Sequence, residues 1–261
     1  MACICRASGE VVGTFVPVLV YWVYSGICMA LASTGKYRLH PRKEAADKNL
    51  VSKRRVLLGV LVQQAFHVAL SLYFLKAMRK SRSGAAAGDD AVPTSLLALA
   101  GQFLLAMLVL DAWQYFLHRY MHANSFLYRY SHSKHHRLVV PYAFGALYYH
   151  TPEGLLLNTI GGFVAVVASG MSIRASIFFF SLVAVKNVDI HCGMWIPWHP
   201  LNALFGNNGA YHDLHHQTQG GNYNFSQPFF VFWDRILGTH LPYDVKKREE
   251  GGFELRAATE A

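Results

Sequence analysis

Three long runs of apolar residues constrain the fold of this chain more than any other feature of its sequence. Residues 11–32 form an uncharged run of 22, and residues 56–78 and 96–116 form two further runs with few charges. At 1.5 Å per residue in an α-helix, each run is long enough to cross a hydrocarbon core of about 30 Å. The sequence therefore predicts a membrane protein with three long spans.

Two shorter apolar segments, residues 155–170 and 173–188, follow the third run. At about sixteen residues each they are short for full spans, so we expect a hairpin over 155–188 that dips into the membrane or crosses it twice. The chain returns to the same side in either case. The predicted fold is all-α: a polytopic helical bundle of three long spans and a shorter hairpin, within one membrane-embedded domain, 1–261.

Composition and charge narrow the class of protein further. The chain is 53% hydrophobic and only 15% charged, which is unusual for a soluble protein. Its net charge of +9 is also found in nucleic-acid-binding proteins. The basic residues, however, cluster beside the apolar runs, where lipid headgroups and membrane topology explain them. We therefore expect a membrane as the partner of the basic residues, and no nucleic acid.

The distribution of basic residues predicts the topology. Residues 36–55 contain eight basic side chains and two acidic ones, so this loop is expected to be cytosolic and the N-terminus lumenal. The polar, glycine-rich linker 81–90 is then lumenal. The third span returns the chain to the cytosol, where residues 117–150 and 189–240 form the predicted metal-site region. The charged, glycine-containing tail, 246–261, is expected to be frayed.

Eight histidines fall into three short clusters at the cytosolic ends of the spans. Residues three or four apart on a helix share a face, so the rings of one cluster can aim at one point. Neutral imidazole binds iron, zinc and copper, and eight histidines exceed what one tetrahedral ion requires. The sequence therefore predicts two metals and a catalytic role for their ligands. The predicted ligands are His118, His122, His132, His135, His136, His212, His215 and His216.

Other polar residues are candidates for a place at this site. His191, where the hairpin ends, is the favoured ninth ligand. Asp111 precedes His118 by two helical turns and can accept a ring N–H from a ligand, although a structural ion pair is an equal alternative. His150 and Glu153 form an H-x-x-E pair before the hairpin; a role as metal ligands or as hydrogen-bond partners of the ligands and a purely structural role are both open.

The histidine clusters belong to a set of longer motifs in the chain. The motifs are His118-Arg119-x-x-His122, His132-x-x-His135-His136, His150-x-x-Glu153, His212-x-x-His215-His216 and Asp234-Arg235-x-x-Gly238-Thr239. Together they resemble the fatty acid hydroxylase/sterol desaturase superfamily of membrane di-iron enzymes. Longer stretches, residues 35–40, 113–122 and 223–230, are similar to the plant-type sphingoid base 4-hydroxylases, or sphinganine 4-monooxygenases, and the likeness covers nearly the whole chain.

The resemblance implies a multi-pass enzyme of the endoplasmic reticulum membrane with its active site on the cytosolic face. Such an enzyme uses O₂ to hydroxylate carbon 4 of sphinganine or its ceramide, which gives phytosphingosine-type bases. It implies two iron ions, with electrons from NAD(P)H supplied through a reductase and a separate cytochrome b5. This chemistry agrees with the histidines, because an unactivated methylene offers no acidic proton and a redox metal must activate oxygen.

A substrate of this kind also needs an anchor for its polar head. The methylenes of an alkyl chain are chemically alike, so polar residues near the metals must fix which carbon lies over them. We expect Glu153, Asn187 or Asp189 to hold the amino-diol by hydrogen bonds, with a structural role as the alternative for each.

Two other classes of protein fit part of the pattern. A related di-iron lipid oxidase acting on fatty acyl chains, sterols or aldehydes would carry the same histidine clusters, and analysis of its products distinguishes it. A non-enzymatic metal transporter or structural metal-binding protein would also be rich in histidine. Its ligands would lie along a pore within the spans, whereas the clusters here lie at span ends.

Overall fold

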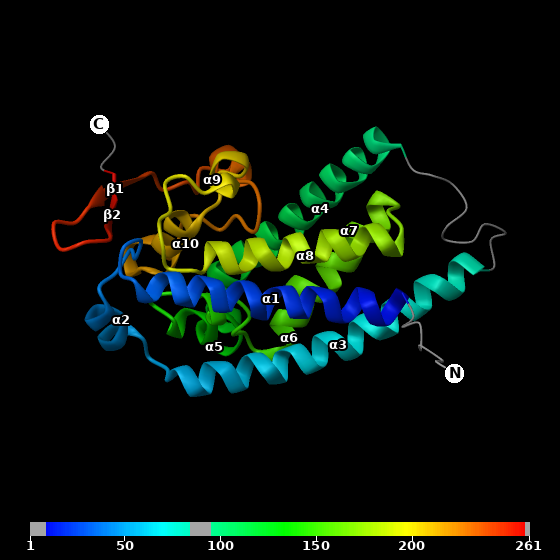
Figure 1. Ribbon diagram of the computed structural model, residues 1–261, viewed down its shortest axis with the longest axis horizontal. Helices are drawn as coiled ribbons and strands as arrows, with labels where there is room; N and C mark the ends of the chain where they lie inside the picture. Colours follow the sequence, from blue (N-terminus) through cyan, green and yellow to red (C-terminus); the bar gives the residue numbers. More distant parts are fainter. Residues whose placement is uncertain (1–8, 84–94, 259–261) are drawn as a thin grey trace, which may run out of the picture.

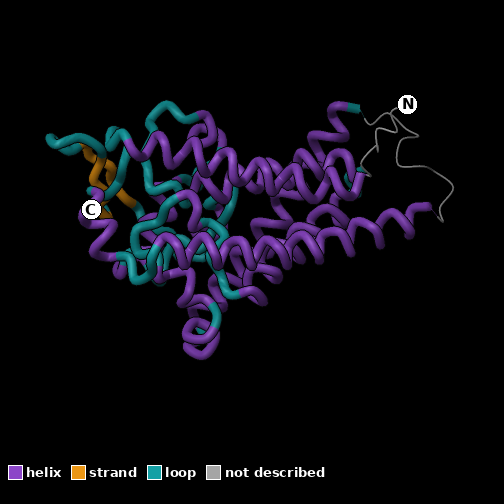
Figure 2. Tube along the Cα trace, turned by 60° about the horizontal axis from the view of Figure 1, so that its bottom comes forward, coloured by secondary structure: helices purple, strands orange, loops and turns teal. Residues whose placement is uncertain are grey.

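The computed structural model describes residues 9–83 and 95–258, so most of the linker 81–90 lies outside the described residues. Its long helices lie side by side along the long axis of the molecule (Figure 1). Loops, short helices and two strands gather at one end of these helices (Figure 2). The helices are α1 Gly9–Ser33, α2 Arg42–Lys48, α3 Lys53–Ser83, α4 Leu96–Ala123, α5 Ser125–Tyr130, η1 His132–Arg137, η2 Ala143–Gly145, α6 Thr151–Gly154, η3 Leu155–Ile160, α7 Gly161–Ser169, α8 Ile173–Ile190, α9 Pro200–Leu204, α10 Gly209–His216, η4 Thr218–Gly220 and α11 Phe232–Ile236.

Four helical stretches of the described chain are long and apolar enough to cross a membrane. They are Val11–Ser33 in α1, Lys53–Met78 in α3, Leu96–Ala123, which is α4, and Thr151–Ser169, which comprises α6, η3 and α7. The first three confirm the predicted long spans, and the fourth is the first arm of the predicted hairpin. The predominantly helical membrane fold is therefore confirmed.

Exposed apolar side chains mark the surfaces that would face lipid. On α1, Leu19, Val23 and Ile27 recur at every fourth position, and each is more than half exposed. Residues four apart share a face of a helix, so these side chains form one apolar stripe on the outside of the bundle. A stripe of this kind is costly in water and favourable in a bilayer.

The second arm of the hairpin, α8, is not among these four stretches. It packs along α1 (Figure 1) and carries Arg174, Lys186 and Asp189. The side chain of Lys186 is fully buried and donates a hydrogen bond to Asp189 Oδ2 at 2.8 Å. Charged groups are tolerated inside a membrane protein when they face protein and are paired. α8 is therefore a central helix of the bundle.

Two apolar clusters of buried residues lie on the two sides of α8. One joins α8 to α1 and α3 and includes Tyr21, Val60 and Val188. The other joins α8 to α4 and α7 and includes Leu110 and Phe179. The helices on the two sides are thus packed around a single central helix, α8, whose last turn leads to His191.

The C-terminal region forms a β-hairpin, so the expectation of a frayed tail over 246–261 is wrong for residues up to 258. Strands β1 (Tyr243–Lys247) and β2 (Phe253–Ala257) pair antiparallel. The backbone N–H of Phe253 donates to the carbonyl of Arg38 at 2.8 Å, and Arg248 also donates to that carbonyl. These hydrogen bonds fasten the hairpin to the segment after α1. Residues 259–261 lie outside the described residues.

Candidate metal centre

Nine histidines from four elements meet at the end of the bundle where the short helices gather. They come from the last two turns of α4, from η1, from the residue that ends α8, and from α10. The structure thus brings together all eight histidines of the three sequence clusters and the ninth candidate. Within each of two groups the ring nitrogens lie within 4.8 Å of one another. One group is His118, His122, His132, His136 and His215, and the other is His135, His191, His212 and His216.

The two groups do not correspond to the sequence clusters. The cluster in η1 is divided, because His132 and His136 join one group and His135 joins the other. The cluster in α10 is divided in the same way, with His215 in the first group and His212 in the second. Each group therefore needs three elements of the fold, which makes the site a property of the tertiary structure.

Hydrogen bonds to backbone carbonyls fix the protonation of four of the rings. A carbonyl only accepts, so the Nδ1 that faces it carries the proton, and Nε2 of the neutral ring presents a lone pair. Burial also lowers the pKa of His191 and of His215 to about 4, so both rings are neutral at pH 7. The donor–acceptor pairs are His118–Phe225 at 2.8 Å, His191–Asn187 at 2.7 Å, His215–Tyr223 at 2.7 Å and His216–Leu138 at 2.9 Å.

These lone pairs point at one another, which is the arrangement that a cation stabilises. The Nε2 atoms of His118 and His132 lie 3.0 Å apart. Nδ1 of His132 donates to Glu153, so neither Nε2 carries a proton to share. Nε2 of His215 and of His216 is buried without a hydrogen-bond partner among the described residues. Nitrogen ligands about 2.1 Å from a shared metal lie roughly 3 Å apart, so the residues fit bound metal ions.

The second group shows the same close approach. Nε2 of His191 lies 3.1 Å from Nε2 of His135 and 3.0 Å from Nε2 of His212. Because Nδ1 of His191 is occupied by a carbonyl, its Nε2 offers only a lone pair to these neighbours. With four rings in this group and five in the other, two ions share the nine imidazoles without either group exceeding the usual coordination of a first-row metal.

Glu153 contacts this site, whereas His150 does not. The buried Glu153 carboxylate accepts hydrogen bonds from His132 Nδ1 and, at 3.1 Å, from Ser131 Oγ. Such a carboxylate orients a ligand ring and makes its other nitrogen a stronger donor to a metal. His150 is exposed at the N-terminus of α6 and belongs to neither group.

Asp111 holds a loop, and no histidine is bonded to it among the described residues. Its buried carboxylate accepts the backbone N–H groups of Phe229 at 3.2 Å and Phe230 at 2.7 Å. The same loop contains Phe225, whose carbonyl orients His118. Asp111 therefore supports the site through the loop, rather than through the direct ring contact that its helical spacing suggests.

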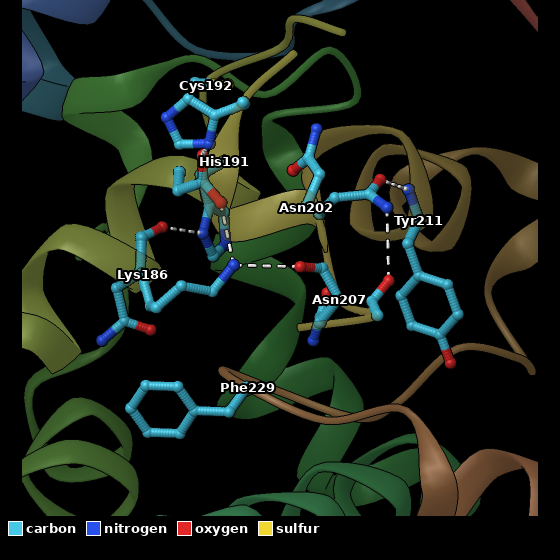
Figure 3. A network of polar contacts seen from close by, with 12 residues as sticks. Lys186, His191, Cys192, Asn202, Asn207, Tyr211 and Phe229 are labelled. Carbon is cyan, nitrogen blue, oxygen red and sulfur yellow. Dashed lines mark hydrogen bonds and ion pairs between the residues drawn. The ribbon is translucent and has the colours of Figure 1, made fainter. Parts of the chain in front are cut away.

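Asp189 is committed to an ion pair. It accepts a hydrogen bond from Lys186, which also donates to the carbonyl of Asn207 at 2.9 Å (Figure 3). Its other oxygen lies 3.5 Å from Nδ1 of His199. The carboxylate is therefore not free to hold a substrate, and its contacts instead stabilise the turn that presents His191. Asn187, two residues earlier, lines a cavity.

A buried carboxylate, Asp234, organises the loop after α10, and its spacing from other polar residues does not by itself indicate this role. Asp234 accepts hydrogen bonds from the N–H groups of Phe225 and Ser226, from the Tyr211 hydroxyl at 2.6 Å and from Thr239 Oγ1 at 2.7 Å. The sequence did carry a signal, because Asp234 and Thr239 both belong to the closing motif of the superfamily resemblance.

His40 is a second residue whose contact the sequence does not indicate. It links the segment after α1 to α10. Its Nε2 donates to Asp213 Oδ1 at 2.7 Å, and its Nδ1 lies 3.1 Å from Glu44. Asp213 stands directly after the ligand candidate His212 in α10. As an isolated histidine, His40 gives no sequence signal of this contact.

Comparisons with known proteins agree with this geometry. The family model described as "Fatty acid hydroxylase" matches residues 103–239. The chain is 57% identical to sphinganine C4-monooxygenase 2 of Arabidopsis thaliana over 95% of each chain. It is 52% identical to a very-long-chain aldehyde decarbonylase of Oryza sativa subsp. japonica over 95% of each, and 41% identical to a sphingolipid C4-hydroxylase of Schizosaccharomyces pombe over 87% of this chain and 86% of the relative. No solved structure matches. The chain belongs to the fatty acid hydroxylase family.

Proposed function

We propose that this protein hydroxylates carbon 4 of a sphingoid base with O₂, at a centre of two iron ions held by the nine histidines. The observation that carries the proposal is the convergence of neutral imidazole lone pairs in two groups. The substrate follows from the relatives, because two of those compared above are named for C4 oxidation of sphinganine or a sphingolipid.

A cavity lined in part by Asn187, one helical turn before His191, supports a lipid substrate. Its volume is about 120 Å³, and it lies between α1, α3, α8 and the segment η3–α7. Its lining is polar at the end where Gln64, Asn158 and Asn187 lie, and apolar at the end where Leu75 and Phe163 lie. An amphipathic lipid fits such a cavity with its head at the polar end and its alkyl chain at the apolar end.

The polar end is the one next to the metal centre. Asn187 precedes His191 by four residues, which is about one turn or 6 Å along the helix axis. A head docked there places the first carbons of the alkyl chain nearest the histidines. Of the three candidates for head-group anchoring, Asn187 is the one that lines the cavity.

The chain's own residues prepare the site for oxidation. Backbone carbonyls and Glu153 hold the imidazoles in one tautomer and orientation, and the apolar wall of the cavity excludes water from the substrate. Bound iron would supply the activation of O₂ that an unactivated methylene requires. The two electrons come, in this proposal, from NAD(P)H through a reductase and cytochrome b5, as the sequence resemblance implies.

A second candidate function is the oxidation of a very-long-chain aldehyde. It is favoured by the 52% identity to a relative named as an aldehyde decarbonylase. The histidine groups serve either reaction, but the polar end of the cavity offers several hydrogen-bonding groups, which suit an amino-diol better than a single aldehyde oxygen. We therefore place C4 hydroxylation first.

Product analysis separates these functions. In a host that lacks 4-hydroxylated long-chain bases, expression of this chain is expected to produce phytosphingosine in an oxygen-dependent manner. The measurement is the position of the new hydroxyl group by mass spectrometry. Long-chain bases that stay dihydroxylated while fatty acids, sterols or aldehydes are oxidised would contradict the sphingoid substrate and leave the family unchanged.

We further propose that the protein lies in the endoplasmic reticulum membrane with its metal centre on the cytosolic side. The support is the loop 36–55, with its eight basic residues, which leads from α1 to α3 at the end of the bundle where the histidines lie (Figure 1). A glycosylation acceptor inserted near Ser83 is therefore expected to be modified, and one near Lys246 to stay unmodified. Glycan transfer near Lys246, measured by gel shift, would contradict this topology.

A further inference from the structure

The cavity that Asn187 lines, one helical turn before His191, has no formally charged side chain in its lining. Among its described lining residues there is no Asp, Glu, Lys or Arg, and the polar groups are amides, hydroxyls and one imidazole. A buried ammonium requires a carboxylate or several acceptors to replace its hydration. The electrostatics of this lining therefore bear on the charge of the substrate's head.

The one imidazole in the lining, His67, is held neutral by its partners. The Gln63 side-chain amide N–H donates to His67 Nε2 at 2.6 Å, because an amide nitrogen cannot accept. His67 Nδ1 then carries the proton and donates to Thr159 Oγ1 at 3.0 Å. Both ring nitrogens of His67 therefore have a hydrogen-bond partner, and the neutral ring brings no charge to the cavity.

The carboxylates near the cavity already have hydrogen-bond or ion-pair partners. Glu153 accepts from His132 and Ser131, Asp189 pairs with Lys186, and Asp111 accepts two backbone N–H groups. The nine imidazoles add no negative charge. A substrate ammonium at the polar end of the cavity would thus meet no free carboxylate among the residues that the structure describes.

Asn158 adds a specific preference, because its orientation is fixed by a chain of hydrogen bonds. The Gln114 Nε2 donates to the carbonyl of Leu157 at 3.3 Å and to Asn158 Oδ1 at 3.2 Å. The oxygen of Asn158 is therefore used, and its Nδ2 is buried with no partner in the described part of the chain. An unpaired buried donor is costly, and a ligand oxygen that accepts from it restores the lost hydrogen bond.

The unpaired Nδ2 of Asn158 lies at the end of the cavity where the head of a substrate would dock. Asn158 belongs to the π-helical turn η3, a type of turn that is frequent at functional sites. Its partner Gln114 lies one turn of α4 before His118, just as Asn187 lies one turn of α8 before His191. Polar side chains from α4, η3 and α8 thus lie about one helical turn from the histidines.

Building on the proposed function, we propose that the substrate enters this cavity as an N-acylated sphingoid base, a dihydroceramide, in preference to the free base. The nitrogen of sphinganine is an ammonium at pH 7, which only donates hydrogen bonds and finds no free carboxylate here. The amide of dihydroceramide is neutral, and its carbonyl oxygen can accept from Asn158 Nδ2. The long-chain base occupies the apolar end of the cavity.

Binding to the purified protein tests this preference independently of turnover. In nanodiscs without reductant, N-acetylsphinganine and dihydroceramide are expected to bind about tenfold or more tightly than sphinganine at pH 7, measured as ligand-induced shifts of the unfolding temperature. N-acetylsphinganine is the decisive ligand, because it removes the charge of sphinganine and adds no second long chain.

A single substitution should reverse the preference. Asn158→Asp keeps an oxygen to accept from Gln114 and converts the spare donor into a negatively charged acceptor. Sphinganine is then expected to bind more tightly than N-acetylsphinganine. Asn222→Asp, the same change at an exposed position in the loop after α10, serves as the matched control and should leave the ratio unchanged. If Asn158→Asp does not fold, the comparison of ligands on the unaltered protein decides alone.

The outcomes distinguish the inference from the function on which it rests. Equal binding of sphinganine and N-acetylsphinganine would overturn the inference and leave C4 hydroxylation in place. Binding of a long-chain aldehyde, with none of the three sphingoid ligands bound, would overturn both.

Discussion

Replacing His135 with alanine is expected to remove metal from the second group and to abolish hydroxylation. His135 is 1% exposed, its Nε2 lies 3.1 Å from that of His191, and its ring stacks on Tyr149 at 4.3 Å. The loss of activity should exceed the 10- to 100-fold that follows removal of a ligand's hydrogen-bond partner, because the ligand itself is lost. Product formed per protein chain and metal bound per chain are the two measurements.

His150→Ala is the matched control for this experiment. His150 is a candidate by sequence spacing, yet it is exposed and lies outside both groups. The variant should keep both metals and most of the activity. Full activity of His135→Ala with an unchanged metal content would contradict the assignment of the second group.

Asp234→Ala is expected to destabilise the protein strongly. The substitution leaves two backbone N–H groups and two hydroxyls without their acceptor in a buried region. Each unpaired buried group costs about 1–3 kcal/mol, so the combined effect should be several kcal/mol and lower the unfolding temperature markedly. Metal should also be lost more readily, because the Phe225 carbonyl that orients His118 belongs to the same loop.

The control for this variant is Asp244→Ala. Asp244 is an exposed carboxylate on β1, and its removal should change the unfolding temperature little. Thermal unfolding in detergent measures both variants. An Asp234→Ala protein that unfolds at the temperature of the unaltered chain and retains its metal would show that the loop holds its shape without this carboxylate.

The sequence predicts the spans and the set of histidines well, because both signals are local. An uncharged run of apolar residues determines a span by its length alone, as in 11–32. Repeated spacing selects histidines that share a face, and His191 adds to them by its place at the end of an apolar arm. The structure brings these nine rings together, although their role as ligands remains a prediction.

What the sequence does not predict depends on contacts between distant segments. Helical periodicity correctly places Asp111 on one face of α4 with His118, but the group that meets the carboxylate comes from the loop at Phe229, more than a hundred residues away. The division of His132 and His135 between two groups also depends on which helix faces each ring. The β-hairpin is missed because its charged residues resemble a free tail, whereas its strands pair with each other and bond to Arg38.

Metal content of the active protein tests the two-metal centre most directly. Protein purified with retained activity should contain about two irons per chain, since the nine imidazoles form two groups of ring nitrogens. Zinc in place of iron in an inactive sample would agree with the ligand set, because imidazole sites also accept zinc. Full activity with one iron per chain, or with none, would contradict the account.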